Sequence, residues 1–245
     1  MQVYKAPLND MKFLFKDFLY DGGFDIIFQN SDFEFSDLDL ILDQAARFCE
    51  EELLPINQTG DGEGCSYERG QVITPTGFKE AYGKYVSNGW QSATLDKRYG
   101  GSGLPYVLGV FLDEMMSSSN MSFGNFPGLT TNAFAAIEKS ASEELKDLYL
   151  PKLATGEWSG TMNLTEPQCG TDLGLTRTMA LPQDDDSYRI TGTKIFITGG
   201  EHDLSENIIH LVLAKTPGAP KGIKGISLFL VPKIIPNSDG SLDKN

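Results

Sequence analysis

The stretch Gly160-Thr161-Met162-Asn163-Leu164-Thr165-Glu166-Pro167-Gln168-Cys169-Gly170-Thr171-Asp172 lies just past the point where this chain changes its hydrophobic pattern. A second stretch follows it, Lys194-Ile195-Phe196-Ile197-Thr198-Gly199-Gly200. Both stretches combine β-branched or apolar residues with hydroxyls and glycines. This composition is expected where backbone comes close to a flat polar ligand. We refer to residues 160–172 and 194–200 as the first and second cofactor segments.

The chain before Gly156 has the pattern of helices, because apolar residues recur every three or four positions. Residues 57–73 contain four glycines and are predicted to form a surface loop between helices. Ser140 or Ser142 is the expected cap of the last helix. The predicted helices are 36–55, from Thr74-Pro75 to Asn88-Gly89, from Pro105 through Met116, 128–139 and 142–153.

After Gly156 the apolar runs become short or alternating, with Gly, Pro and Asp clusters between them, which is typical of strands. The sequence thus predicts an α+β fold, with an all-helical domain over 1–156 and a β domain over 157–245. The predicted strands are 159–165, 173–180, 187–191, 193–198, 207–214 and 226–232.

The composition of the chain argues against several classes of function. A content of 40% hydrophobic and 22% charged residues is typical of a globular protein. The net charge of -14 argues against a nucleic-acid-binding surface. No apolar run approaches the roughly 20 residues of a membrane helix, and the N-terminus lacks an apolar signal core. We therefore expect no membrane span and a cytoplasmic location.

Several common site types have no support in the residues. Three cysteines without a CxxC spacing disfavour disulfides and zinc, and His202 and His210 make a poor metal pair, so no metal is expected. No P-loop, GxGxxG after a strand, GxSxG or HExxH occurs. Nucleotide hydrolysis, nicotinamide binding by a Rossmann unit and serine-hydrolase chemistry are therefore disfavoured.

The two cofactor segments offer the groups that a flavin needs. Leu164-Thr165 at a strand end supplies backbone groups and a hydroxyl, and Gly170-Thr171 supplies amides suited to an anion. Phe196 could form a wall against the ring, and Thr198 adds a second hydroxyl. The residues alone also allow a plainer interpretation, in which Thr165-Glu166-Pro167 is an ordinary strand-to-turn junction and Phe196 is a core residue.

Four motifs in this order resemble the acyl-CoA dehydrogenase family. They are YGGSGLP, YLPKLATGEW, LTEPQCGTDLG and TKIFITGG, with Thr171 where serine is commoner and Phe196 where tryptophan is common. MQVYKAPLNDMKFLF and GGEHDLSENIIHLVLAKT are similar to the subgroup that includes 3-methylmercaptopropionyl-CoA dehydrogenase. The resemblance implies an N-terminal helical domain and a β-barrel-like middle domain that is incomplete here. It also implies that the family's C-terminal helical domain is absent.

The resemblance also implies a chemistry: α,β-dehydrogenation of an acyl-CoA thioester, for instance 3-methylmercaptopropionyl-CoA, with hydride transfer to FAD. An electron-transfer flavoprotein would take the electrons, and a homo-oligomer is expected when the protein is complete. By matching position, Met162, Leu164 and Thr165 would contact the isoalloxazine ring. Gly170 and Thr171 would lie near the pyrophosphate or the CoA portion of the substrate. Phe196 would cover the ring, and Ile197 and Thr198 would hydrogen-bond at its hydride-accepting edge.

The catalytic base stays unassigned. Glu114, Glu138 and Glu166 are candidates by residue type, but the family's pattern places the base beyond Asn245. Glu166 belongs to the turn motif and is expected to be structural. The chain alone is therefore expected to bind FAD weakly and not to turn over. Two alternatives stay open: a truncated binding or scaffold module without catalysis, and a related flavoenzyme such as an acyl-CoA oxidase or a nitroalkane-type oxidase.

Overall fold

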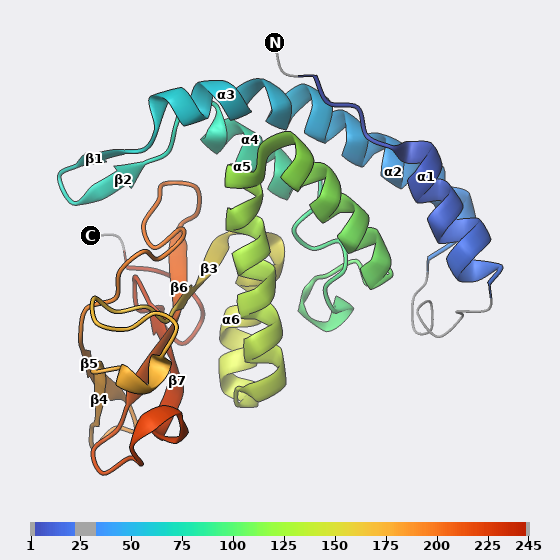
Figure 1. Ribbon diagram of the computed structural model, residues 1–245. Helices are drawn as coiled ribbons and strands as arrows, with labels where there is room; N and C mark the ends of the chain where they lie inside the picture. Colours follow the sequence, from blue (N-terminus) through green and yellow to red (C-terminus); the bar gives the residue numbers. More distant parts are fainter. Residues whose placement is uncertain (1–2, 23–32, 244–245) are drawn as a thin grey trace.

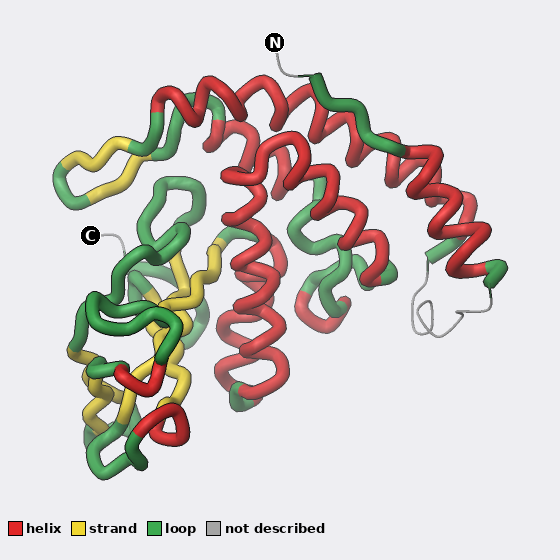
Figure 2. The backbone as a smooth tube through the Cα atoms, in the orientation of Figure 1, coloured by secondary structure: helices red, strands yellow, loops and turns green. Residues whose placement is uncertain are grey.

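The computed structural model describes residues 3–22 and 33–243. Helices dominate the first part of this chain and strands the second, as the separation of red from most of the yellow in Figure 2 shows. The α+β class is therefore confirmed. We refer to the described residues up to Thr155 as the helical part, and to those from Trp158 onward as the sheet part.

The helical part begins with α1 (Leu8–Phe13) and η1 (Leu14–Tyr20). After η3 (Phe35–Asp37), a long helical segment runs along the top of Figure 1 and is made of α2 (Leu38–Arg47), η4 (Phe48–Leu53) and α3 (Leu54–Glu63). The hairpin β1 (Ser66–Glu68) and β2 (Gln71–Ile73) projects from its end. The remaining elements are α4 (Phe78–Ser87), η5 (Lys97–Tyr99), α5 (Tyr106–Ser140) and α6 (Glu143–Thr155).

The predicted loop over 57–73 is wrong. Its second half forms the β1–β2 hairpin, and its first half continues the helix to Glu63 despite Gly60 and Gly62. Gly60 is buried, and a Cβ there would lie 2.6 Å from Cε2 of Phe78 on α4. Because Gly60 has no side chain, α3 can pack closely on α4. This tertiary contact outweighs the low helix propensity of glycine.

The two helices predicted over 105–116 and 128–139 belong to one element, α5, which changes direction at Asn120 (φ -157°, ψ 85°). Asn120 is fully buried. Its Oδ1 accepts hydrogen bonds from Ser122 Oγ at 2.9 Å and from Phe123 N at 3.0 Å, and its Nδ2 donates to Leu53 O at 3.2 Å. Asn120 therefore caps the second half of α5 in the manner of an N-cap residue. The predicted cap Ser142 is confirmed on α6, where its Oγ accepts from Leu145 N.

The sheet part contains one mixed five-stranded sheet. Its strands are β3 (Trp158–Asn163), β4 (Met179–Pro182), β5 (Tyr188–Thr191), β6 (Asn207–Lys215) and β7 (Ile226–Pro232), with the short turns η6 (Leu173–Leu175) and η7 (Gly222–Gly225). Strand β6 pairs with β3 and β4 in parallel and with β7 antiparallel, and β5 pairs with β4. Two strand predictions need correction: the strand expected over 173–180 begins only at Met179, and residues 193–198 form no strand.

The sheet packs against the helical part through β3 and α5, which run side by side in Figure 1. Gly160 makes the contact close, because a Cβ there would lie 2.4 Å from Cβ of Ala133. Its amide N–H donates to Thr130 Oγ1 at 3.1 Å. The first cofactor segment thus starts on a strand that is fixed against a helix. Among the described residues, no helix has the length and apolar character needed to cross a membrane.

Candidate functional site

The two cofactor segments lie side by side where β3 ends. Ile195 N donates to Thr165 O at 3.0 Å, and Lys194 Nζ donates to Leu164 O at 2.9 Å. The bond to Thr165 joins two backbone groups, and the bond to Leu164 comes from a lysine side chain. Leu164 and Thr165 are thus each fixed by a separate hydrogen bond. The structure therefore holds the start of the second segment, directly before the predicted ring residue Phe196, against Leu164 and Thr165 of the first segment.

Glu166 is the centre of this arrangement. Its carboxylate accepts hydrogen bonds from Arg177 N at 2.8 Å and from both N and Oγ1 of Thr178, at 3.1 and 2.5 Å. Lys194 Nζ donates to it at 2.9 Å, and Gln168 Nε2 also donates. An isolated bridge between Glu166 and Cys169 closes the turn that follows. Glu166 thus ties the first segment to the start of β4 and to the second segment.

The environment of Glu166 makes it unsuitable as a general base. Burial alone would raise the pKa of its carboxyl group, but the bonds from Thr178, Lys194 and two backbone amides outweigh this and lower the pKa to about 2. A carboxylate with so low a pKa is a weak base, and its oxygens already accept hydrogen bonds. It therefore does not abstract a proton from a substrate. Of the other two candidate glutamates, both on α5, Glu114 is exposed and Glu138 is half-buried. The assignment of the base to a position outside this chain stays a prediction.

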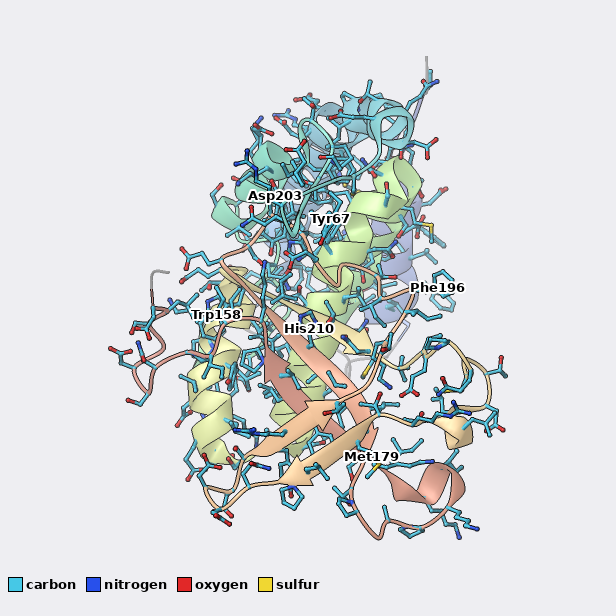
Figure 3. The ribbon with its side chains drawn as sticks, turned by 90° about the vertical axis from the view of Figure 1, so that its left-hand side faces the viewer. Tyr67, Trp158, Met179, Phe196, Asp203 and His210 are labelled. Atoms are coloured by element: carbon cyan, nitrogen blue, oxygen red, sulfur yellow. The ribbon has the colours of Figure 1, made fainter. Side chains whose placement is uncertain are left out.

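Phe196 has a backbone and an exposure that are unusual for its residue type. Its φ is 56°, in the left-handed region that bulky residues avoid. Its side chain is 90% exposed, and Figure 3 shows it at the outer edge of the sheet part, on the other side from Trp158. The interpretation of Phe196 as a core residue is therefore wrong. A solvent-exposed aromatic residue with a strained backbone suggests a functional role for that residue.

The residues after Phe196 form a turn that contains two glycines. Gly199 also has a positive φ, 60°, and Gly200 N donates to Ile197 O at 3.1 Å, which closes a tight turn after the ring. Within residues 3–22 and 33–243, the hydroxyls of Thr165 and Thr198 have no hydrogen-bond partner. Gly170 and Thr171 are exposed, whereas Met162 and Ile197 are half-buried.

The site is an open surface in this chain. A cavity of about 590 Å³ lies instead in the helical part, between α2, η4 and α4. Its lining includes Arg47, Lys84 and Trp90 but no residue of either cofactor segment. The chemistry-bearing residues therefore meet on an exposed face and not in the helical cavity.

The two histidines are structural. His202 is buried, and its Nδ1 accepts from Leu204 N at 3.1 Å, so its Nε2 carries the proton and donates to Ser159 Oγ at 2.9 Å. This tautomer cannot activate Ser159 as a nucleophile. His210 Nδ1 lies 2.7 Å from Thr161 Oγ1. No group of three metal-ligating side chains occurs in the part of the chain that the structure describes.

Sequence reasoning missed Lys194. Its side chain is only 10% exposed and is paired with Glu166, whose side chain is 2% exposed. A lysine beside the apolar run Ile195-Phe196-Ile197 was the available signal, since a charged side chain at such a position needs a buried partner. Nothing in the local pattern identifies Glu166 as that partner.

Two family profiles match the chain. The profile of the acyl-CoA dehydrogenase N-terminal domain matches residues 36–157, and that of the acyl-CoA dehydrogenase middle domain matches residues 161–241. The second match contains the second cofactor segment and all of the first after Gly160.

Individual relatives agree with the profiles. The chain is 48% identical to 3-methylmercaptopropionyl-CoA dehydrogenase of Ruegeria pomeroyi and 40% identical to a butyryl-CoA dehydrogenase of Syntrophomonas wolfei. Each match covers 97% of this chain but only 40% of the relative, so the chain spans less than half of either. The solved acyl-CoA dehydrogenase of Bacillus anthracis, a complex with FAD, superposes with a TM-score of 0.65 at 26% identity over 82% of this chain and 31% of its own.

Proposed function

Because this chain belongs to the acyl-CoA dehydrogenase family, we propose that it supplies the flavin-contacting part of an FAD-dependent enzyme that oxidises an acyl-CoA thioester between its α and β carbons. The observation that supports this most is that Ile195, the residue directly before the exposed Phe196, is hydrogen-bonded to Thr165. The backbone of Phe196 holds its ring outward in water. A flat ring system stacked on it would bury that exposed aromatic surface.

The residues present fit a flavin. Its ring needs an apolar wall and hydrogen-bonding groups along its polar edge, and Phe196 provides the first. The hydroxyls of Thr165 and Thr198, unpartnered in the described residues, provide the second. Met162 and Leu164 add half-buried apolar surface at the end of β3. Each residue is thus available for the role that the family resemblance implies.

Gly170 and Thr171 would bind an anionic group. They follow the turn closed by Glu166 and Cys169 and are exposed, so their amides can reach a phosphate. This would be the pyrophosphate of the cofactor or the CoA portion of the substrate. The overall charge of -14 does not oppose such binding, because backbone amides rather than lysines would hold the anion.

Bound FAD would supply the hydride acceptor, and the chain would supply its surroundings. Phe196 would exclude water from one face of the ring. Thr198 and the Ile197 backbone would hydrogen-bond at the hydride-accepting edge, and Thr165 would fix the opposite polar edge. Glu166 would take no part in proton transfer, since its carboxylate is committed to Thr178 and Lys194.

For the substrate we propose a short acyl-CoA. The two relatives named above act on different acyl groups, 3-methylmercaptopropionyl and butyryl, which share a short unbranched chain on a CoA thioester. We propose an electron-transfer flavoprotein as the electron acceptor and a homo-oligomer as the working form.

The test is a titration of the purified 245-residue protein with FAD, followed by quenching of flavin fluorescence. We expect weak binding by the parent. Phe196→Ala, Thr198→Ala and Gly170→Trp should each raise the dissociation constant, by about tenfold for the aromatic truncation, which corresponds to ~1.4 kcal/mol. Tyr67→Ala is the matched control, because Tyr67 is a 75% exposed aromatic residue on the β1–β2 hairpin.

The outcomes separate clearly. Loss of affinity at Phe196 with none at Tyr67 supports the proposal. A parent protein that binds no FAD at concentrations reached in the titration, or a Phe196→Ala variant that binds as the parent does, overturns it.

A further inference from the structure

We propose that the buried Glu166–Lys194 ion pair is a positioning device that keeps residues 193–198 out of strand geometry and thereby presents Phe196 on the surface. The inference deepens the proposed function and rests on it only in taking Phe196 as the residue that meets the flavin.

The local sequence favours a different structure. Thr193-Lys194-Ile195-Phe196-Ile197-Thr198 combines β-branched and aromatic residues in a short apolar run, which predicts a strand. In a strand Lys194 and Phe196 would project from the same face, because alternate side chains do. In the structure Lys194 is buried and Phe196 is almost fully exposed. The left-handed backbone at Phe196 changes the side toward which the side chains of this segment project.

Lys194 has a specific reason to stay inside. Its ammonium group donates to Glu166 Oε1 and to Leu164 O, both at 2.9 Å. A buried cation is stable only when it is paired and hydrogen-bonded, and Glu166 is itself held by the backbone and hydroxyl of Thr178. The lysine is therefore fixed to a rigid partner.

The next residue is fixed too, because Ile195 N donates to Thr165 O. Because Lys194 and Ile195 are both held against the first segment, the chain changes direction at Phe196. Without the charge pair, the Leu164 carbonyl would be the one acceptor left to the Lys194 ammonium group among the residues that the structure describes. The segment could then relax toward the extended geometry that its sequence favours, and the ring could cover itself against neighbouring apolar surface.

A fluorescent reporter tests this without any ligand. Phe196→Trp places an indole at the position, and its emission is obtained by subtracting the spectrum of the matching Phe196 protein, which contains Trp90 and Trp158. In this background we would compare Lys194→Met, Glu166→Gln and the double variant E166Q/K194M with the unmodified pair. Lys152→Met is the control, because Lys152 on α6 also forms an ion pair, with Glu157 just after the helix.

We expect the reporter emission to shift to shorter wavelength, and its quenching by acrylamide to fall at least about twofold, when the pair is broken, because an indole that leaves water is both blue-shifted and shielded. Lys152→Met should leave both unchanged. The double variant carries neither buried charge, so it tests the idea even if a single variant fails to fold, as circular dichroism would show. A folded double variant whose reporter is as exposed as in the parent pair overturns the proposal.

FAD titration of the same variants gives a second readout. If the parent binds FAD, breaking the pair should weaken binding by about tenfold. If the parent does not bind FAD, the proposed function fails, whereas the reporter still decides whether the pair positions residue 196.

Discussion

Asp203 in the sheet part accepts two hydrogen bonds from Thr74 in the helical part, from its backbone N at 3.0 Å and from its Oγ1 at 2.8 Å. Figure 3 shows Asp203 among the side chains of the helical part. The neighbouring Leu204 is 9% exposed and belongs to the apolar core of the helices. The loop between the second cofactor segment and β6 thus anchors the sheet part to the helical part.

Asp203→Ala should lower the free energy of unfolding by ~2 kcal/mol, because it leaves the buried N–H and hydroxyl of Thr74 without an acceptor. Urea denaturation measures the loss. Asp203→Asn keeps one oxygen and should lose less. Asp185→Ala is the control, since Asp185 makes a similar pair of bonds to Ser187 in an exposed turn. Equal losses at the two aspartates would contradict the anchoring role.

Leu204→Ala should cost roughly 2–4 kcal/mol, as expected for a buried leucine whose cavity cannot fully collapse. The midpoint of denaturant unfolding reports it. The control is Leu175→Ala, which removes the same atoms from a side chain that is 55% exposed. This control should change stability by less than about 0.5 kcal/mol. A small effect at Leu204 would mean that the loop docks only through Asp203.

Stability should fall as the pH drops from 6.5 toward 4, because of His202. Burial lowers the pKa of this imidazole to about 4, so between these pH values the unfolded chain binds a proton that the folded one excludes. The contribution is complete above about pH 6.5 and is on the order of 3 kcal/mol. Denaturant unfolding at several pH values measures it.

His202→Gln should flatten most of this slope, and His210→Gln, whose histidine also has a lowered pKa through burial, should remove a separate part. Glu166, with its pKa lowered from 4.5 to about 2, loses its contribution only below pH 4.5. An unchanged slope in His202→Gln would show that other groups carry the acid sensitivity.

Phe196→Gly should be more stable than Phe196→Ala by ~1 kcal/mol in the flavin-free protein, since glycine adopts a positive φ without the cost that a Cβ imposes. Thermal or urea unfolding compares them. The same two substitutions at Tyr188, in strand β5, should show the opposite order. A less stable glycine variant at position 196 would mean that the left-handed backbone is not strained.

Much of the fold was predictable from local pattern. The change from a helical to an alternating period near Gly156 marks the boundary between helices and strands. Ser142 caps α6 because a hydroxyl before an acidic first turn satisfies free amides wherever it occurs. The spacing of Leu38, Leu42 and Ala45 likewise identifies buried positions of α2. These features depend on neighbours within a turn or two of the chain.

The failures lie where a distant residue decides the local conformation. Gly60 stays helical because Phe78 packs on it, and Asn120 breaks α5 because its amide reaches Leu53. We attribute the absence of a strand over 193–198 to the pairing of Lys194 with Glu166, 28 positions away.

Local sequence was enough to establish the class of fold, since periodicity is a property of neighbouring positions, and residue chemistry in the same sequence predicted the two cofactor segments. The meeting of those segments and the outward direction of Phe196 emerge only in three dimensions. Buried charges and close contacts are satisfied by partners that no short window of sequence contains, so no local pattern could have revealed them.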